Sequence, residues 1–82
     1  MFASIEKKLI EKNYKENLLN GYLFAYQNKK DQLKNIELFY DTNTNKYIFS
    51  FPLYNSKNNY TIHFNYFQDL KQYMNYIVVN YI

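Results

Sequence analysis

The sequence predicts an α+β fold: an N-terminal helix, a four-stranded antiparallel β-meander and a C-terminal helix, with both helices on one face of the sheet. Helical apolar patterns stand at the two ends of the 82-residue chain. Between them lie four short runs rich in aromatic and β-branched residues, separated by polar connectors of hairpin length. A chain of this length is expected to form a single domain, residues 1–82.

The first helix is expected to run from Phe2 to Leu18. Apolar residues recur there every three to five positions, and lysines and glutamates occupy much of the remaining surface. Asn20 and Gly21 follow, and Gly21 is the only glycine in the chain. Because glycine readily adopts the left-handed conformation that follows many helices, the helix is predicted to end there.

Four strands are predicted next, each bounded by turn residues. They are Tyr22–Tyr26, Ile36–Asp41, Lys46–Leu53 and Tyr60–Phe64. The third is the most apolar and is therefore expected at the centre of the sheet. Pro52 should mark its end or a bulge, because proline donates no hydrogen bond to a neighbouring strand. In the fourth strand, Tyr60, Ile62 and Phe64 alternate with Thr61 and His63, which places His63 on the face away from the helices.

The C-terminal segment has the clearest helical pattern. Asn65 is expected to cap the helix together with Gln68, and Asp69 lies in the first turn, where the helix dipole favours a negative charge. Tyr73 falls on the flank of the apolar stripe and Tyr76 opposite it. The stripe itself comprises Phe67, Leu70, Met74, Ile77, Val78 and Tyr81.

Aromatic residues dominate the apolar composition, with eleven Tyr and seven Phe making up 22% of the chain. Each buries roughly 150–250 Å², so a few of them supply much of the core of a small domain. The aromatic residues assigned to the core are Phe49, Phe51, Tyr60, Phe64 and Phe67.

The residue inventory argues against an enzyme. The chain has no cysteine, which excludes disulfides, thiolate metal sites and a cysteine nucleophile. Its single histidine, His63, has no acidic neighbour in the sequence, and one glycine cannot build a phosphate-binding loop. We therefore expect no catalytic residues, no metal site and no cofactor. The absence of a long apolar run and of an apolar leader predicts a cytoplasmic protein without a membrane span.

Direct binding to RNA or single-stranded DNA is the alternative function. The net charge is +3, and residues 1–35 contain seven lysines against four acids. Exposed aromatic rings would stack on bases while lysines contact phosphates. Arginine is absent, however, and glutamates alternate with the helical lysines, so direct nucleic-acid binding is less expected than protein binding. The lysines concerned are Lys7, Lys8, Lys12, Lys15, Lys29 and Lys30.

A protein partner is the leading expectation, because two helices cover only one face of a four-stranded sheet. Exposed aromatic patches rimmed by polar groups tend to be interaction sites, and tyrosine is favoured in them. The candidate interface residues are Phe39, Ile48, Tyr54, His63, Tyr73 and Tyr76. A homodimer through the uncovered face is a further alternative. The competing interpretation is codon bias, since thirteen Asn and ten Lys without Arg fit an AT-rich genome.

In size, composition and expected architecture the chain resembles the small inhibitor proteins of phages and mobile elements, including anti-CRISPR proteins. The resemblance implies a non-enzymatic module that occludes the surface of a host protein, such as a nuclease or another nucleic-acid-handling defence complex. Many such inhibitors use acidic surfaces. This chain is mildly basic, so contact through aromatic and asparagine-rich surface is expected rather than mimicry of DNA phosphates.

Overall fold

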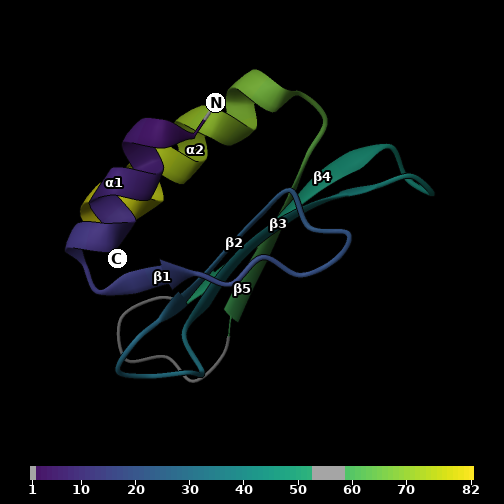
Figure 1. Ribbon diagram of the computed structural model, residues 1–82. Coiled ribbons are helices and arrows are strands. Elements are labelled where there is room, and N and C mark those ends of the chain that lie inside the picture. The colour runs from purple at the N-terminus through teal and green to yellow at the C-terminus, as the bar shows by residue number, and fades with distance from the viewer. Residues whose placement is uncertain (1, 53–58) are drawn as a thin grey trace.

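An antiparallel sheet carries helices from both ends of the chain, as predicted, but it has five strands rather than four (Figure 1). The computed structural model describes residues 2–52 and 59–82. The elements are α1 (Ala3–Glu11), β1 (Tyr14–Glu16), β2 (Phe24–Asn28), β3 (Asn35–Asp41), β4 (Lys46–Pro52), β5 (Asn59–Phe64) and α2 (Phe67–Asn80).

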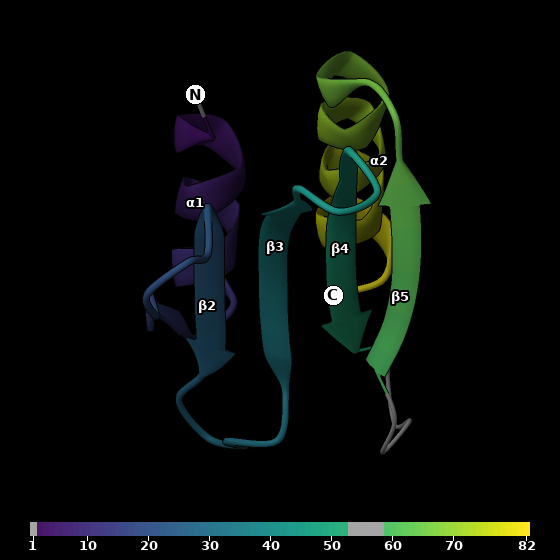
Figure 2. The ribbon, with the colours of Figure 1, turned by 90° about the vertical axis from the view of Figure 1, so that its right-hand side faces the viewer.

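The strands are arranged as a simple meander. Their order in the sheet is β1-β2-β3-β4-β5, and every neighbouring pair is antiparallel. Figure 2 shows both helices behind the sheet, α1 behind β2 and α2 behind β4 and β5. The opposite face, which carries Phe39, Ile48 and His63, is called the open face below. No helix in the described part of the chain has the length and apolar character needed to cross a bilayer.

The first helix is shorter than predicted, ending at Glu11 instead of Leu18. Asn13 adopts a left-handed conformation with φ 68°, which turns the chain out of the helix. Tyr14 then begins β1 and is only 4% exposed. The helical spacing continued through Tyr14 because α1 and β1 send side chains into the same core. Leu18, the last residue of the predicted apolar stripe, is exposed.

The chain between Glu11 and Phe24 is therefore a strand and a connection rather than the end of a helix. β1 pairs with β2, and the backbone N–H of Asn17 extends the pairing by donating to the carbonyl oxygen of Ala25 at 3.0 Å. Gly21 has the expected left-handed conformation, with φ 94°. It lies in the connection between β1 and β2, so the prediction that it ends a helix is wrong.

The four predicted strands correspond to β2, β3, β4 and β5, with ends that coincide or differ by at most two residues; Leu53, the predicted end of the third strand, lies outside the described residues. The additional strand changes their positions in the sheet. β3 lies at the centre, and β4, predicted to be central, is next to the edge. Pro52 is the last residue of β4 and of the described segment before residue 59, and it is opposite Asn59 in the pairing with β5.

The start of α2 differs from the predicted capping pattern. The N-cap residue is Tyr66, no side chain caps the helix there, and Asn65 and Gln68 do not form the predicted reciprocal cap. Tyr66 is extended, with φ −118° and ψ 135°, and leads the chain from the edge of the sheet onto its face. The helix starts at Phe67, whose ring reaches the core. Asp69 lies in the first turn, as predicted.

The core lies between the sheet and the two helices. Phe64 and Phe67 pack against it while partly buried, whereas Tyr60 is 49% exposed, contrary to its predicted core position. Tyr60 lies on the edge strand β5, where a neighbouring strand shields it on one side only. The largest fully buried side chains are Phe49, Phe51, Leu9, Ile36, Leu38, Leu70, Met74 and Val78.

Candidate functional site

The predicted interface residues fall on two different surfaces. Phe39, Ile48 and His63 form one row across β3, β4 and β5 on the open face, because Ile48 pairs with Phe39 on one side and His63 on the other. Tyr73 and Tyr76 belong to α2, on the opposite side of the sheet. Tyr54 lies outside the described residues.

The centre of the open face is shielded. Ile48, predicted to be exposed there, is only 9% exposed. Its two cross-strand neighbours flank it: Phe39 is half-buried, and His63 is exposed. The ring of Tyr22 meets that of Phe39 edge-on, with centroids 5.7 Å apart. An apolar side chain enclosed in this way offers little area to a partner.

Polar groups on the same face are engaged within the molecule. The carboxylate of Asp41 accepts hydrogen bonds from the backbone N–H of Asn43 at 2.9 Å and the hydroxyl of Thr44 at 3.0 Å. These bonds lower the pKa of Asp41 and fix the turn that follows β3. The negative charge of Glu37, together with a hydrogen bond to it, raises the pKa of Tyr22. These contacts stabilise the fold and do not assemble a catalytic group.

The second surface is a groove between α2 and the edge of the sheet, with a cavity of about 330 Å³. Phe51 and Ile77 are buried, while Tyr60 and Tyr76 are exposed at the rim. We call this groove, with the outer side of β5, the α2–β5 surface. Its lining residues are Phe51, Tyr60, Ile62, Tyr73, Tyr76, Ile77 and Tyr81.

Tyr73 anchors the groove to the core. Its ring lies 5.4 Å from that of Phe64, 6.0 Å from that of Phe51 and 6.4 Å from that of Phe49. Tyr73 was predicted to be a surface residue, yet it is partly buried and packs against the core. It therefore forms the floor of the groove and supports the exposed ring of Tyr76, whose centroid is 6.5 Å away.

Tyr76 is held in place at the rim. Its hydroxyl oxygen lies 3.0 Å from that of Tyr81, and the two ring centroids are 5.4 Å apart. This hydrogen bond raises the pKa of Tyr76. With 48% of its surface exposed, Tyr76 presents a fixed aromatic ring to the outside. A fixed ring loses little conformational entropy when a partner covers it.

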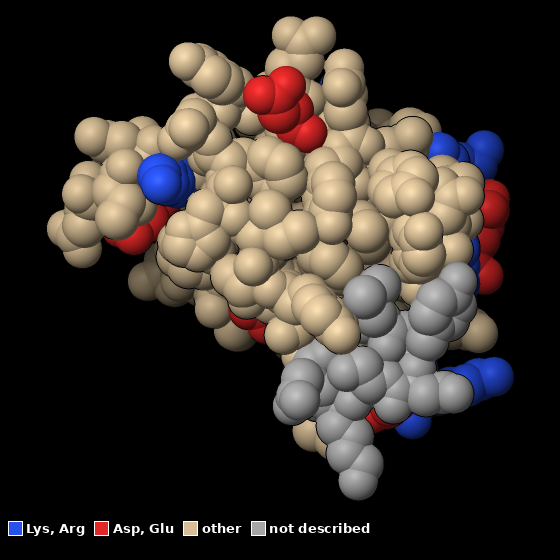
Figure 3. Space-filling model, turned by 180° about the vertical axis from the view of Figure 1, so that it is seen from behind, with Lys and Arg blue, Asp and Glu red and all other residues tan. Residues whose placement is uncertain are grey.

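The described residues of the α2–β5 surface form an uncharged groove. Among the residues that the structure describes, none of those lining the groove is acidic or basic. Figure 3 views the molecule from the side of β5 and α2, and shows a broad area of uncharged residues with lysine and acidic side chains mainly around its margins. A large uncharged aromatic area on the exterior is characteristic of interaction sites.

β5 adds an open sheet edge to this surface. Within residues 2–52 and 59–82, it pairs with β4 alone, so its outer side has no strand partner. Its sequence, Asn59–Phe64, contains no Lys, Asp, Glu or Pro. These are the residues that usually protect edge strands from pairing with other chains. As far as residues 2–52 and 59–82 show, β5 is therefore an unprotected edge.

The lysines of the nucleic-acid alternative lie toward the other edge of the sheet, on α1 and at its C-cap, on β1 and in the connection after β2. The backbone N–H of Lys29 donates to the carbonyl oxygen of Asn13 at 2.8 Å, which brings that connection beside the end of α1. The Nζ of Lys8 donates to Oδ1 of Asn75 on α2 at 2.9 Å. Glu11 and Glu16 stand among these lysines in the sequence. The lysines thus gather at one end, with acids interspersed.

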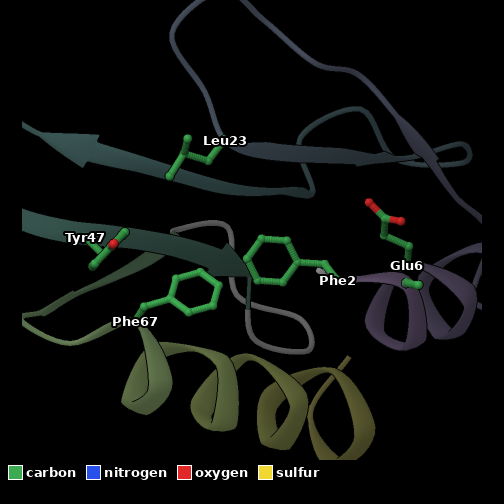
Figure 4. A pocket seen from close by; sticks show the side chains of 6 residues that line it. Phe2, Glu6, Leu23, Tyr47 and Phe67 are labelled. Carbon is green, nitrogen blue, oxygen red and sulfur yellow. The ribbon is translucent and has the colours of Figure 1, made fainter.

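A further cavity of about 550 Å³ opens between the start of α1, β2 and the start of α2. Figure 4 shows Phe2 and Phe67 with their rings close together in its wall, and the centroids are 5.6 Å apart. Leu23, Tyr47 and Glu6 complete this wall, with Ala3. Among the described residues that line this cavity, Glu6 is the only acidic or basic one.

In the part of the chain that the structure describes, no cluster of three or more His, Asp or Glu residues is arranged to hold a metal ion. Comparisons with protein-family models, curated proteins and solved structures find no match to this chain.

Of the groove residues, only Tyr73 and Tyr76 are among the predicted interface residues, and three further residues that are not fully buried escape the prediction: Tyr60, Ile62 and Tyr81. Tyr60 was assigned to the core, and Ile62 and Tyr81 were placed on apolar stripes without a role at the surface. The available signal was topological: the last strand of a meander is an edge strand, so side chains of its buried face are covered on one side only. Applied to Tyr60, that rule predicts partial exposure next to α2.

Proposed function

We propose that this protein is a non-enzymatic binding module that occludes the surface of a partner protein, and that it binds through the α2–β5 surface. The supporting observation, within the described residues, is the combination of two half-exposed tyrosines, Tyr60 and Tyr76, with a charge-free groove and an unprotected strand edge. Tyrosine at such sites buries a large area with few rotatable bonds and retains a hydrogen-bonding hydroxyl.

The open face supports the function less well than expected from the sequence. Ile48 is shielded, Phe39 is half-buried against Tyr22, and Asp41 is engaged in its own turn. The inhibitor role implied by the resemblance to phage proteins remains a prediction. It names the class of partner to test first, a host protein that handles nucleic acid.

Capture of partners from host extract by tagged variants tests this function. The double variant Tyr60→Ser, Tyr76→Ser removes both rim rings while leaving the fully buried core unchanged. We expect at least one host protein to bind the wild-type chain and to lose most of its binding to this variant, as measured by quantitative mass spectrometry. Circular dichroism should show that the variant remains folded.

Three control variants separate the alternatives. Leu33→Ser alters an exposed apolar residue far from the groove in the sequence, in the connection between β2 and β3, and should leave capture unchanged. Phe39→Ala tests the open face, and Lys29→Gln with Lys30→Gln tests the lysines in the connection after β2. If the captured protein is lost with Phe39→Ala and kept by the tyrosine variant, the α2–β5 surface is not the site. Loss of a bound RNA or DNA with the lysine variant alone would favour the nucleic-acid alternative.

A further inference from the structure

We propose that in the free protein the α2–β5 surface is occupied by a second copy of the chain, the two copies pairing antiparallel through β5 about a two-fold axis. This inference rests on the proposed function, because it assigns an occupant to the same surface. A host partner would then compete with the second copy for this surface. In the absence of a partner, the surface is covered in the dimer.

The two edge strands of the sheet, β1 and β5, differ in length and in charge. β1 has three residues, two of which are Lys15 and Glu16. β5 has six residues and none of them is charged. A short charged edge resists pairing, whereas a longer uncharged edge presents backbone N–H and C=O groups to another strand. Pairing through β5 alone therefore stops at two copies and does not continue into a fibre.

The distribution of charge favours contact at this end of the molecule. Residues 1–35 hold seven lysines and four acids, a net charge of +3, and residues 36–82 hold three lysines and three acids, a net charge of zero. The excess positive charge belongs to the part of the chain that forms α1, β1 and β2, at the opposite side of the sheet from β5. Two copies joined at β5 keep these positive regions as far apart as the sheet allows.

The position of α2 adds a second layer to the contact. α2 lies behind β4 and β5 (Figure 2), so a two-fold axis perpendicular to the sheet brings both copies of α2 to the same face, side by side and antiparallel. Tyr76 and the groove residues of each copy then face the other copy. Asp69 lies near the start of each α2, so antiparallel packing places the two carboxylates toward opposite ends of the interface.

The exposed rings supply part of the area that a stable dimer needs. A tyrosine side chain buries roughly 150–250 Å², so the exposed halves of Tyr60 and Tyr76 together offer about 200 Å². That is about a quarter of the roughly 800 Å² that each partner contributes to an interface of standard size. The proposed dimer requires the outer side of β5 and the facing side of α2 to contribute the remaining area.

Sedimentation equilibrium of the full chain over a dilution series tests this proposal. The wild-type protein should change from a mass near 10.1 kDa to twice that value as its concentration rises. Tyr60→Lys places a positive charge on β5 in both copies, and should weaken dimerisation about tenfold or more. Tyr76→Lys should act in the same direction from α2. Leu33→Lys adds the same charge to an exposed apolar residue outside the interface and should have no effect.

A wild-type mass near 10.1 kDa at every concentration would overturn the proposal. So would a dimer that both lysine variants leave intact, since it would use another surface. Amide hydrogen exchange gives an independent readout that does not depend on the folding of a variant. Amides of Asn59–Phe64 should exchange more slowly as the concentration rises, and those of Tyr14–Glu16 should not change.

The two proposals fail separately. If the wild-type protein is monomeric but host-protein capture depends on Tyr60 and Tyr76, the second copy is excluded and the binding surface stands. If the dimer forms through β5 but host capture is unaffected by the tyrosine variants, the host binds elsewhere and the dimer stands. If both hold, adding the captured protein should convert dimers into mixed complexes.

Discussion

At the scale of single residues, neighbouring structure decides whether an aromatic side chain is core or surface. Tyr60 and Tyr73 exchange the positions that the sequence predicts for them: Tyr60 is half-exposed, and Tyr73 contacts the rings of Phe49, Phe51 and Phe64. Periodicity identifies the face of an element on which a residue lies. It does not show how much of that face the neighbouring elements cover. Tyr60 is half-exposed because it lies on the edge strand β5, where a neighbouring strand covers it on one side only.

Buried tyrosines also determine how the protein responds to alkaline pH. Burial raises the pKa of Tyr14 and of Tyr26, because an ionised phenolate is poorly solvated in the core. The folded protein therefore keeps protons that the unfolded chain releases near the ordinary tyrosine pKa of about 10. Their contribution to stability is complete below that pH and is lost as the pH rises through the raised folded-state values.

We therefore expect the free energy of unfolding, measured with urea, to fall as the pH rises past about 10. Tyr14→Phe should reduce the slope of this fall, because phenylalanine does not ionise. Leu33→Ala is the control at an exposed residue that does not ionise, and it should leave the slope unchanged. Equal slopes for the wild-type protein and Tyr14→Phe would show that Tyr14 titrates normally in the folded state.

At the scale of elements, α2, β3, β4 and β5 were predictable because each has a continuous pattern of one period between turn residues. The end of α1 was not. Tyr14 satisfies the helical spacing that starts at Phe2, although it lies on a strand. The distinguishing feature is the left-handed conformation of Asn13, which is a weak signal in a sequence that contains thirteen asparagines.

Substitution of Asn13 tests where α1 ends. Asn13→Ala should destabilise the protein by about 1 kcal/mol. Alanine is strained at positive φ, whereas asparagine tolerates this conformation. Asn13→Gly should cost less than Asn13→Ala, because glycine adopts this conformation without strain. Urea denaturation measures both. If alanine stabilised the protein relative to glycine, the chain at Asn13 would be helical, as the longer predicted helix requires.

At the scale of the whole molecule, the structure separates two ends with different chemistry. The part of the chain that forms α1, β1 and β2 carries the net positive charge, and β5 with α2 forms an uncharged aromatic surface. The sequence revealed the charge asymmetry but placed the aromatic surface mainly on the open face. Two helices on a four-stranded sheet leave one face uncovered, which favours the open face as the binding surface. The accessible edge at β5 follows from the order of the strands, which the apolar pattern of each strand does not show.

Hydrogen exchange of the free and partner-bound protein tests most directly whether the α2–β5 surface is the binding surface. When the captured host protein binds, the backbone amides of Asn59–Phe64 should exchange more slowly. So should the amides of those residues of Phe67–Asn80 that border the groove. The open-face strands β3 and β4 and the lysine-bearing connection after β2 should show little change. Protection confined to β3, β4 or that connection, with unchanged exchange in β5 and α2, would contradict it.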